Sequence, residues 1–111
     1  MNIGIESATD DSGRCVVRVS GAIDVQSRGA LLSAGRAALE TDAPTLVLDL
    51  GEVTFLDSTG IGALVELSHD AEDAEVGFAL RDPSVRVIRI LQMTGLGDTW
   101  PTEYSDDESD A

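Results

Sequence analysis

The sequence contains no lysine, and all seven of its basic residues are arginines. The phosphate-binding loop of P-loop proteins and the nucleotide site of protein kinases both use a lysine, so the sequence excludes these two mechanisms. The 21 acidic residues give a formal net charge of −14 at pH 7. Because nucleic-acid backbones bind basic patches, we expect no nucleic-acid partner. The acidic composition instead favours protein partners with basic surfaces.

Cysteine and histidine each occur once, as Cys15 and His69. A lone cysteine cannot form an internal disulfide, which agrees with a reducing compartment. We expect Cys15 to pack as a small apolar side chain, and a redox role for it stays open. His69 has no second histidine or cysteine at metal-ligand spacing, and the acidic stretch 70–75 lacks the residue order of a calcium loop. We therefore expect neither a metal site nor a cofactor.

Long apolar runs are also missing, since none approaches the ~20 residues that a membrane-spanning helix needs. Residues 1–6 lack the basic start and apolar core of a signal peptide. These features predict a cytoplasmic protein without membrane insertion. The length suits one domain with a modest core, expected over residues 1–104. Residues 105–111 are polar and acidic, and we expect them to form a disordered tail.

Changes in apolar spacing predict an alternating series of strands and helices. The expected elements are two strands within residues 1–20, a loop at 21–27, a helix at 27–40, a strand ending near 56, a helix at 59–71, a strand at 76–81, a helix beginning at 83 or 84, and a strand at 99–104. Pro101 confines the last strand to an edge, because proline cannot donate to the sheet. This order predicts an α/β fold with a mixed sheet and helices packed mainly on one side.

The stretch 46–65, LVLDLGEVTFLDSTGIGALV, predicts a buried strand, a tight polar turn and a helix. The expected inner side of that helix consists of Ile61, Leu64, Val65 and Ser68. Asp57, Ser58 and Thr59 are all suited to capping its first backbone N–H groups. Gly60 and Gly62 each cost a helix roughly 0.5–1 kcal/mol relative to alanine, but they leave room for another backbone or a partner. Together these residues predict a functional site at a helix N-terminus, where negative charge is favoured.

Three motifs make the chain similar to a known family. Residues 57–62, DSTGIG, resemble the signature of the STAS domain family, above all that of its bacterial anti-sigma factor antagonists. Residues 21–24, GAID, resemble the family's Gly-Glu-(Leu/Ile)-Asp turn, except that Ala22 replaces the usual acid. Residues 93–96, MTGL, resemble a late element of the family. The resemblance covers nearly the whole chain and implies the STAS fold, a four- to five-stranded mixed sheet flanked by helices.

The resemblance also implies a binding switch centred on Ser58. In such antagonists the serine at this position is phosphorylated by the anti-sigma factor, which is a serine kinase of the histidine-kinase-like ATPase type. The unphosphorylated chain would bind that kinase and free a sigma factor, phosphorylation would abolish binding, and a phosphatase would act on phospho-Ser58. Asp57 would orient Ser58 or assist at the kinase's metal. The implied partner-binding residues are Asp24, Asp57, Ser58, Thr59, Gly60, Ile61 and Gly62.

Other interpretations of these residues stay open. By spacing alone, Ser58 is an N-cap worth about 1 kcal/mol, Asp24 is a residue that bonds its own turn, and Thr59 is a rival phosphate acceptor. A STAS protein can also be a scaffold, or a cytoplasmic accessory subunit of a transport complex, without phosphorylation. An enzyme is disfavoured, because Ser58 lacks the Gly-x-Ser-x-Gly elbow and His69 would lie about 16 Å along the same helix.

Overall fold

A computed structural model of the protein describes residues 3–105. Its elements are, in order, β1 (Ile3–Thr9), β2 (Cys15–Ile23), α1 (Arg28–Leu39), β3 (Thr45–Leu56), α2 (Ser58–Asp73), β4 (Gly77–Arg81), α3 (Val85–Met93) and β5 (Thr102–Glu103). Within this range the strands form a five-stranded sheet in the order β1-β2-β3-β4-β5. The hairpin β1-β2 is antiparallel, and the other neighbours are parallel. The predicted mixed sheet is confirmed.

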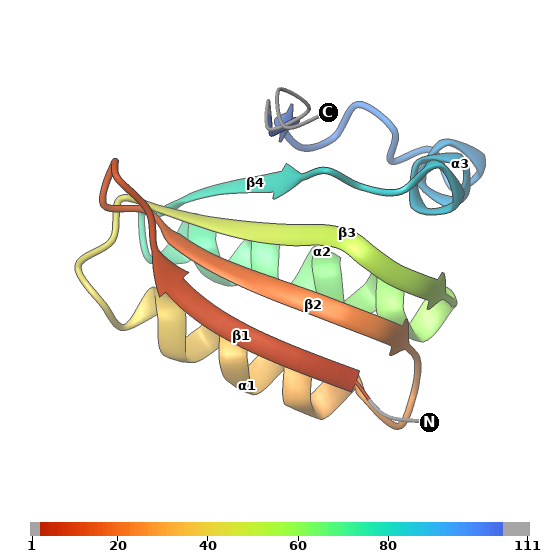
Figure 1. Cartoon of the computed structure of the whole chain (residues 1–111), viewed down its shortest axis with the longest axis horizontal. Coiled ribbons are helices and arrows are strands. Elements are labelled where there is room, and N and C mark those ends of the chain that lie inside the picture. Colours follow the sequence, from red (N-terminus) through yellow and green to blue (C-terminus); the bar gives the residue numbers. More distant parts are fainter. Residues whose placement is uncertain (1–2, 106–111) are drawn as a thin grey trace.

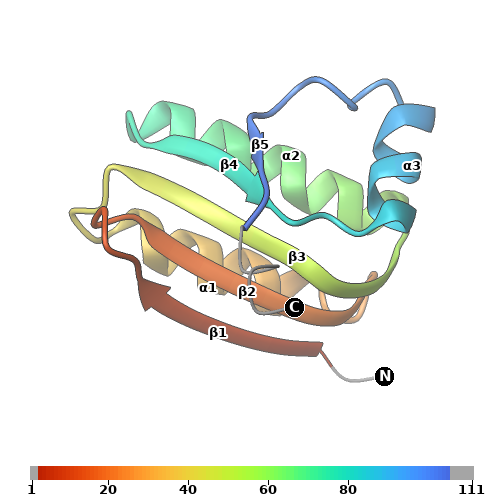
Figure 2. The same ribbon diagram turned by 45° about the horizontal axis from the view of Figure 1, so that its top comes forward.

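The two long helices lie on one face of this sheet (Figures 1 and 2). α1 connects β2 to β3, and α2 connects β3 to β4. Each connection adds its new parallel strand at the same edge of the growing sheet. Because such crossovers are nearly always right-handed, two successive steps in one direction place both helices on the same face. The prediction of helices mainly on one side is therefore also confirmed.

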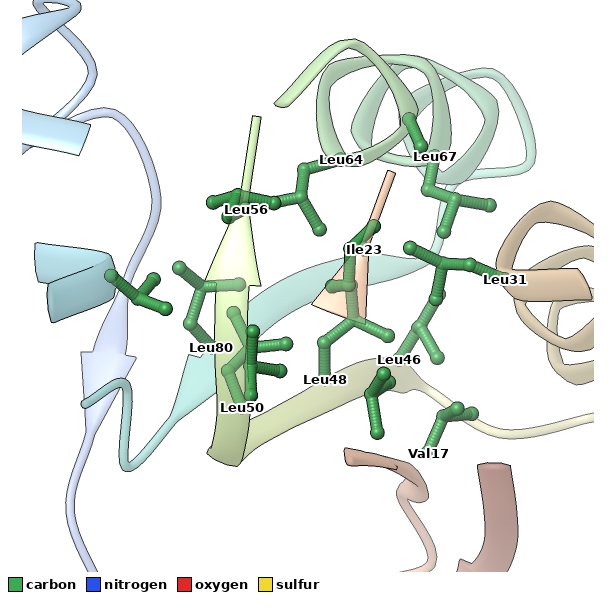
Figure 3. Close-up of a cluster of buried hydrophobic side chains, with 14 of the residues drawn as sticks. Val17, Ile23, Leu31, Leu46, Leu48, Leu50, Leu56, Leu64, Leu67 and Leu80 are labelled. Carbon is green, nitrogen blue, oxygen red and sulfur yellow. The ribbon is translucent and has the colours of Figure 1, made fainter. Parts of the chain in front are cut away.

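The core lies between this helical layer and the sheet. Figure 3 shows Leu31 of α1 and Leu64 and Leu67 of α2 among the buried side chains of the strands. The largest fully buried side chains are Ile23, Leu31, Leu46, Leu48, Leu50, Leu64, Leu67, Leu80, Val17, Val19, Val47 and Val87. α3 packs against β3 and adds Val87 and Leu91 to the same core. Removing this apolar surface from water is the main stabilising contribution, at roughly 25 cal/mol per Å².

β2 is longer than predicted. The loop expected from Gly21 onward begins only after Ile23, which pairs with Leu56 of β3. The ladder is irregular around Gly21, and this residue has a φ of 96°. Glycine reaches positive φ without the steric cost of a Cβ atom, so the strand continues through a bulge. A glycine that the sequence pattern marks as a strand end is here a bend within the strand.

The buried side of α2 also differs from the prediction. Of the expected inner residues only Leu64 is buried, whereas Ile61, Val65 and Ser68 are half-buried. The buried residues of this helix are Gly60, Ala63, Leu64, Leu67 and Ala71. Three of these five residues are glycine or alanine. The prediction was based on large apolar residues at helical spacing and therefore overlooked them. Their small size lets α2 lie close to the sheet.

The chain after β4 returns to the edge of the sheet. Ser84 caps α3 through an oxygen that accepts the backbone N–H of Val87 at 3.3 Å, so the helix begins at Val85, one residue after the later of the two predicted starts. β5 lies at the edge beside β4, within the range of the predicted edge strand. Ser105, the first residue of the predicted tail, donates its backbone N–H to Asp82 at 2.8 Å. Residues 106–111 of that tail lie outside the described residues.

Charged side chains tie β5 to the β1–β2 hairpin. Arg14 donates to both carboxylate oxygens of Glu103, at 2.8 and 3.0 Å, and Arg81 donates to the same carboxylate at 2.8 Å. Asp10 pairs with Arg14 at 2.9 Å. The hydrogen bond from Arg14 is the main reason that the pKa of Glu103 lies below its ordinary value; partial burial opposes this shift and Arg81 adds to it.

We predict that Glu103→Gln destabilises the protein at neutral pH and loses this effect in acid. Since folding lowers the pKa of Glu103, its carboxylate stabilises the fold above the unfolded-state pKa. That contribution disappears as the pH falls below about 4 and through the folded-state pKa. The expected loss at neutral pH is about 1 kcal/mol, the scale of a partly exposed bidentate pair.

Urea unfolding of both proteins across this pH range measures the effect. Glu6→Gln is the matched control, because Glu6 is exposed and forms no ion pair with any of residues 3–105. A free-energy difference between wild type and Glu103→Gln that stays constant from neutral to acid pH would contradict the assignment.

Candidate functional site

The carboxyl ends of β2 and β3 lie side by side at one end of the sheet (Figures 1 and 2). The backbone N–H of Asp57 donates to the carbonyl oxygen of Ile23 at 3.4 Å, which joins the turn after β3 to the end of β2. In open sheets with parallel strands, the connections that follow the carboxyl ends form the usual position of functional sites. All site residues predicted from the sequence lie in these two connections or in the first turns of α2.

Gly60 is the point of closest approach between the two connections. A Cβ atom at this position would lie 2.5 Å from the carbonyl oxygen of Ile23 and 2.6 Å from Cδ1 of Leu56. Only glycine fits there without a shift of the backbone. The room that Gly60 was predicted to leave is therefore filled by the backbone of β2, and this contact fixes the start of α2 against the sheet.

Asp57 caps α2. Its Oδ1 accepts the backbone N–H of Gly60 at 3.0 Å, and its carbonyl oxygen accepts the backbone N–H of Ile61 at 2.9 Å. A carboxylate at this position satisfies one of the unpaired N–H groups of the first turn and is favoured by the helix dipole. The interpretation of Ser58 as the N-cap is therefore wrong, because Asp57 has that role.

Ser58 lies at the start of α2 with its side chain toward the surface. The residue is exposed, and its hydroxyl makes no hydrogen bond to any of residues 3–105. Gly62 lies four positions further on and therefore on the same side of the helix. It is exposed too, and a Cβ atom there would meet nothing within 4 Å. Thr59, the rival acceptor, is only half-buried. The hydroxyl of Ser58 thus lies beside uncovered backbone on an open surface.

Asp24 is held by its own turn. Its Oδ1 accepts the backbone N–H of Gln26 at 3.0 Å and that of Ser27 at 3.2 Å. Ser27 is the N-cap residue of α1, but its side chain makes no capping hydrogen bond to that helix. Its hydroxyl instead donates to the carbonyl oxygen of Ala22 at 2.7 Å. These bonds order the turn, and Asp24, which directly follows Ile23, is half-buried beside the start of α2.

Sequence reasoning missed two exposed apolar side chains in these connections. Val25, directly after Asp24, is 72% exposed, and Phe55, near the end of β3, is 46% exposed. A signal for Phe55 was present, because successive side chains of a strand point to opposite faces and Phe55 and Leu56 cannot both enter the core. Large apolar side chains that gather at a surface mark contact regions. Val25 follows the end of β2 and Phe55 precedes Ser58 by three residues, so both belong to the segments that carry the site.

The site offers little for catalysis by Ser58 itself. His69 lies eleven positions further along α2 and is exposed, about 16 Å away at 1.5 Å per residue. Among residues 3–105, no group of three or more His, Cys, Asp and Glu side chains could hold a metal ion.

Within the same range, no helix has the length and apolar character needed to cross a membrane. What the arrangement provides is an exposed hydroxyl on a fixed helix end.

We predict opposite effects for alanine at the two glycines of α2. Gly60→Ala should lower the free energy of unfolding by about 2–3 kcal/mol, because the added methyl group overlaps the carbonyl oxygen of Ile23. Gly62→Ala should raise it by about 0.5–1 kcal/mol, because the site is open and alanine favours a helix. Chemical unfolding measures both values. Equal effects of the two substitutions would contradict the close contact at Gly60.

Comparison with known proteins extends these observations. The family model of the STAS domain matches residues 5–111. An anti-sigma-B factor antagonist of Listeria monocytogenes is 31% identical over 98 residues, which cover 88% of this chain and 86% of the relative. The crystal structure of an anti-sigma factor antagonist from Mycobacterium paratuberculosis is 32% identical, with a TM-score of 0.76 and coverage of 97% of this chain and 91% of that one.

A more distant similarity shows the fold alone. The anti-sigma factor antagonist SpoIIAA in its unphosphorylated form has a TM-score of 0.76 with 20% sequence identity, over 96% of this chain and 92% of that one. The family model covers nearly all of the chain, and relatives above 30% identity cover most of it. The chain belongs to the STAS domain family.

Proposed function

We propose that this protein is an anti-sigma factor antagonist whose binding is controlled by phosphorylation of Ser58. The observation that carries the proposal is the exposed hydroxyl of Ser58, which is free because Asp57 caps α2 in its place. The uncovered backbone at Gly62 supports it, because a kinase can reach the hydroxyl and a partner can lie flat over it. The relatives at 31 and 32% identity carry the same functional name.

The unphosphorylated protein binds an anti-sigma factor and thereby frees a sigma factor. The anti-sigma factor is a serine kinase of the histidine-kinase-like ATPase type, and it transfers the γ-phosphoryl group of ATP to the oxygen of Ser58. A phosphatase that acts on phospho-Ser58 restores binding. This cycle takes place in the cytoplasm. The chain is a substrate and a ligand in this cycle and not itself an enzyme.

Charge explains how the modification acts. A phosphate adds about −1.5 to −2 charges at pH 7 and three acceptor oxygens. At the N-terminus of α2 the helix dipole and the backbone N–H groups tolerate this charge, so the fold need not change. In a packed interface the same charge must lose its water and meets any acidic group that faces it, which costs roughly 2–5 kcal/mol. The modification therefore blocks the partner without unfolding the protein.

The neighbouring residues have distinct roles in the proposal. Asp57 fixes the first turn of α2 and orients Ser58 toward the kinase, and Asp24 contributes a carboxylate on the adjacent turn. Gly60 sets the position of the helix, whereas Thr59, Ile61 and Gly62 lie along the contact surface. Gly60 thus acts through packing and Asp57 through the cap of α2, whereas the other residues act through direct contact.

The test is incubation with ATP and each histidine-kinase-like anti-sigma factor encoded in the same genome, followed by phosphosite mapping and affinity measurement. Phosphate is expected on Ser58 and not in Ser58→Ala. Phosphorylation should weaken binding at least about a hundredfold, which corresponds to about 2.7 kcal/mol.

Thr59→Ala is the matched control for the acceptor, because it removes the neighbouring hydroxyl and should still receive phosphate on Ser58. Phosphate on Thr59 would reassign the acceptor. Undiminished binding of the phosphorylated protein, or of Ser58→Asp, would contradict the switch and favour a scaffold or transport-complex subunit. Covalent labelling of Ser58 by a serine-reactive acylating probe would instead point to an enzyme.

A further inference from the structure

The arginines divide into two groups. Five of the seven form ion pairs with carboxylates of the chain. They are Arg14 and Arg81 with Asp10 and Glu103, Arg18 with Asp49, and Arg28 and Arg36 with Glu66. The other two, Arg86 and Arg89, are exposed and form no ion pair with any of residues 3–105.

These two arginines line one apolar groove on the outer side of α3. The groove has a volume of about 540 Å³ and is lined by Phe55, Val85, Arg86, Arg89, Ile90 and Met93. Val85 is 71% exposed and Met93 is 78% exposed. The opposite side of the helix is already packed, since Val87 and Leu91 are buried in the core. A surface helix normally has one apolar side, so the second one is not needed for folding.

The groove adjoins the phosphorylation site. α3 lies at the same end of the sheet as the carboxyl end of β3 and the start of α2 (Figures 1 and 2). Phe55 belongs to the groove and precedes Ser58 by three residues. A stable protein interface covers about 800 Å² on each partner, far more than the surroundings of one serine. A partner that covers Ser58 and extends toward Phe55 reaches the groove on α3.

We propose that this groove binds an acidic segment with apolar side chains that belongs to the anti-sigma factor. The inference rests on the proposed function and adds a second, specificity-determining contact to it. Carboxylates of the segment pair with Arg86 and Arg89, and its apolar side chains cover Phe55, Val85 and Met93. Arginine suits such a contact, because its guanidinium forms bidentate pairs while its stem covers apolar surface. An anti-sigma factor with a basic segment at this place is repelled.

Two other occupants fit the groove less well. The chain's own residues 106–111, DDESDA, are acidic, but they contain no large apolar side chain to cover Met93 or Val85. A second copy of the chain would bring further acidic surface toward this end of the molecule, where Asp24 and Asp57 already lie. The test therefore includes one outcome that would assign the groove to each of these alternatives.

The test compares Arg86→Gln/Arg89→Gln with Ser33→Glu/Ala37→Glu. Each double substitution lowers the net charge by two units from −14, but Ser33 and Ala37 are exposed on α1 and lie outside the groove. Binding to the anti-sigma factor that phosphorylates the wild type is measured at about 50 and 500 mM salt, since screening weakens exposed ion pairs. The arginine variant should bind at least about tenfold more weakly at low salt and lose most of its salt dependence. The α1 variant should behave as wild type.

The apolar part of the groove is tested with Met93→Ser. Met93 is 78% exposed, so the substitution should leave the unfolding transition unchanged and weaken binding about fivefold. Tyr104→Ser, at a 62% exposed position outside the groove, is its control.

Wild-type affinity in the arginine variant would overturn this inference while leaving the proposed function intact. Failure of the wild type to bind any anti-sigma factor would overturn both. Stronger binding after removal of residues 106–111 that disappears in the arginine variant would assign the groove to the tail. Dimers of the wild type that the arginine variant cannot form would assign it to a second copy.

Discussion

The contact between Gly60 and the carbonyl oxygen of Ile23 is the constraint on which the site depends. It brings the first turn of α2 against the end of β2 at a distance that no side chain other than hydrogen allows. The hydrogen bond from the Asp57 N–H to the same carbonyl oxygen, at 3.4 Å, holds the preceding turn. Two connections that are far apart in the sequence therefore present one fixed surface, with the parallel pairing of β2 and β3 beneath it.

This surface separates structural from functional groups. Asp57 caps the helix, Ser27 and Asp24 bond their own turn, and Gly60 provides the close packing. Ser58 is left with no such task within the described chain. A hydroxyl that stabilises nothing can gain a phosphate at little cost to the fold, whereas a phosphate on a capping side chain would break the cap. The same separation holds on α3, whose inner side packs and whose arginines form no ion pair within residues 3–105.

The order of elements, the mixed sheet and the site stretch could be predicted from the sequence because they depend on local spacing and on the DSTGIG motif. The bend at Gly21 and the buried side of α2 could not. Gly21 is a bulge only because β3 continues to pair with the chain beyond it, and Ala63 and Ala71 are buried only because α2 lies close to the sheet. Asp57, Ser58 and Thr59 are all suitable capping residues, so the sequence does not show which of them caps α2. The backbone geometry of the turn decides this, and it selects Asp57.

The central claim is that phosphate on Ser58 changes the charge of a preformed surface and leaves the conformation as it is. Backbone amide NMR of the chain before and after phosphorylation tests it most directly. The account predicts shift changes confined to the first turns of α2 and to the adjacent turn at Asp24, with the amides of the sheet and of α1 unchanged. Changes that extend through β3 and the core, or loss of signals from α2, would contradict it and indicate a switch that works by rearranging the fold.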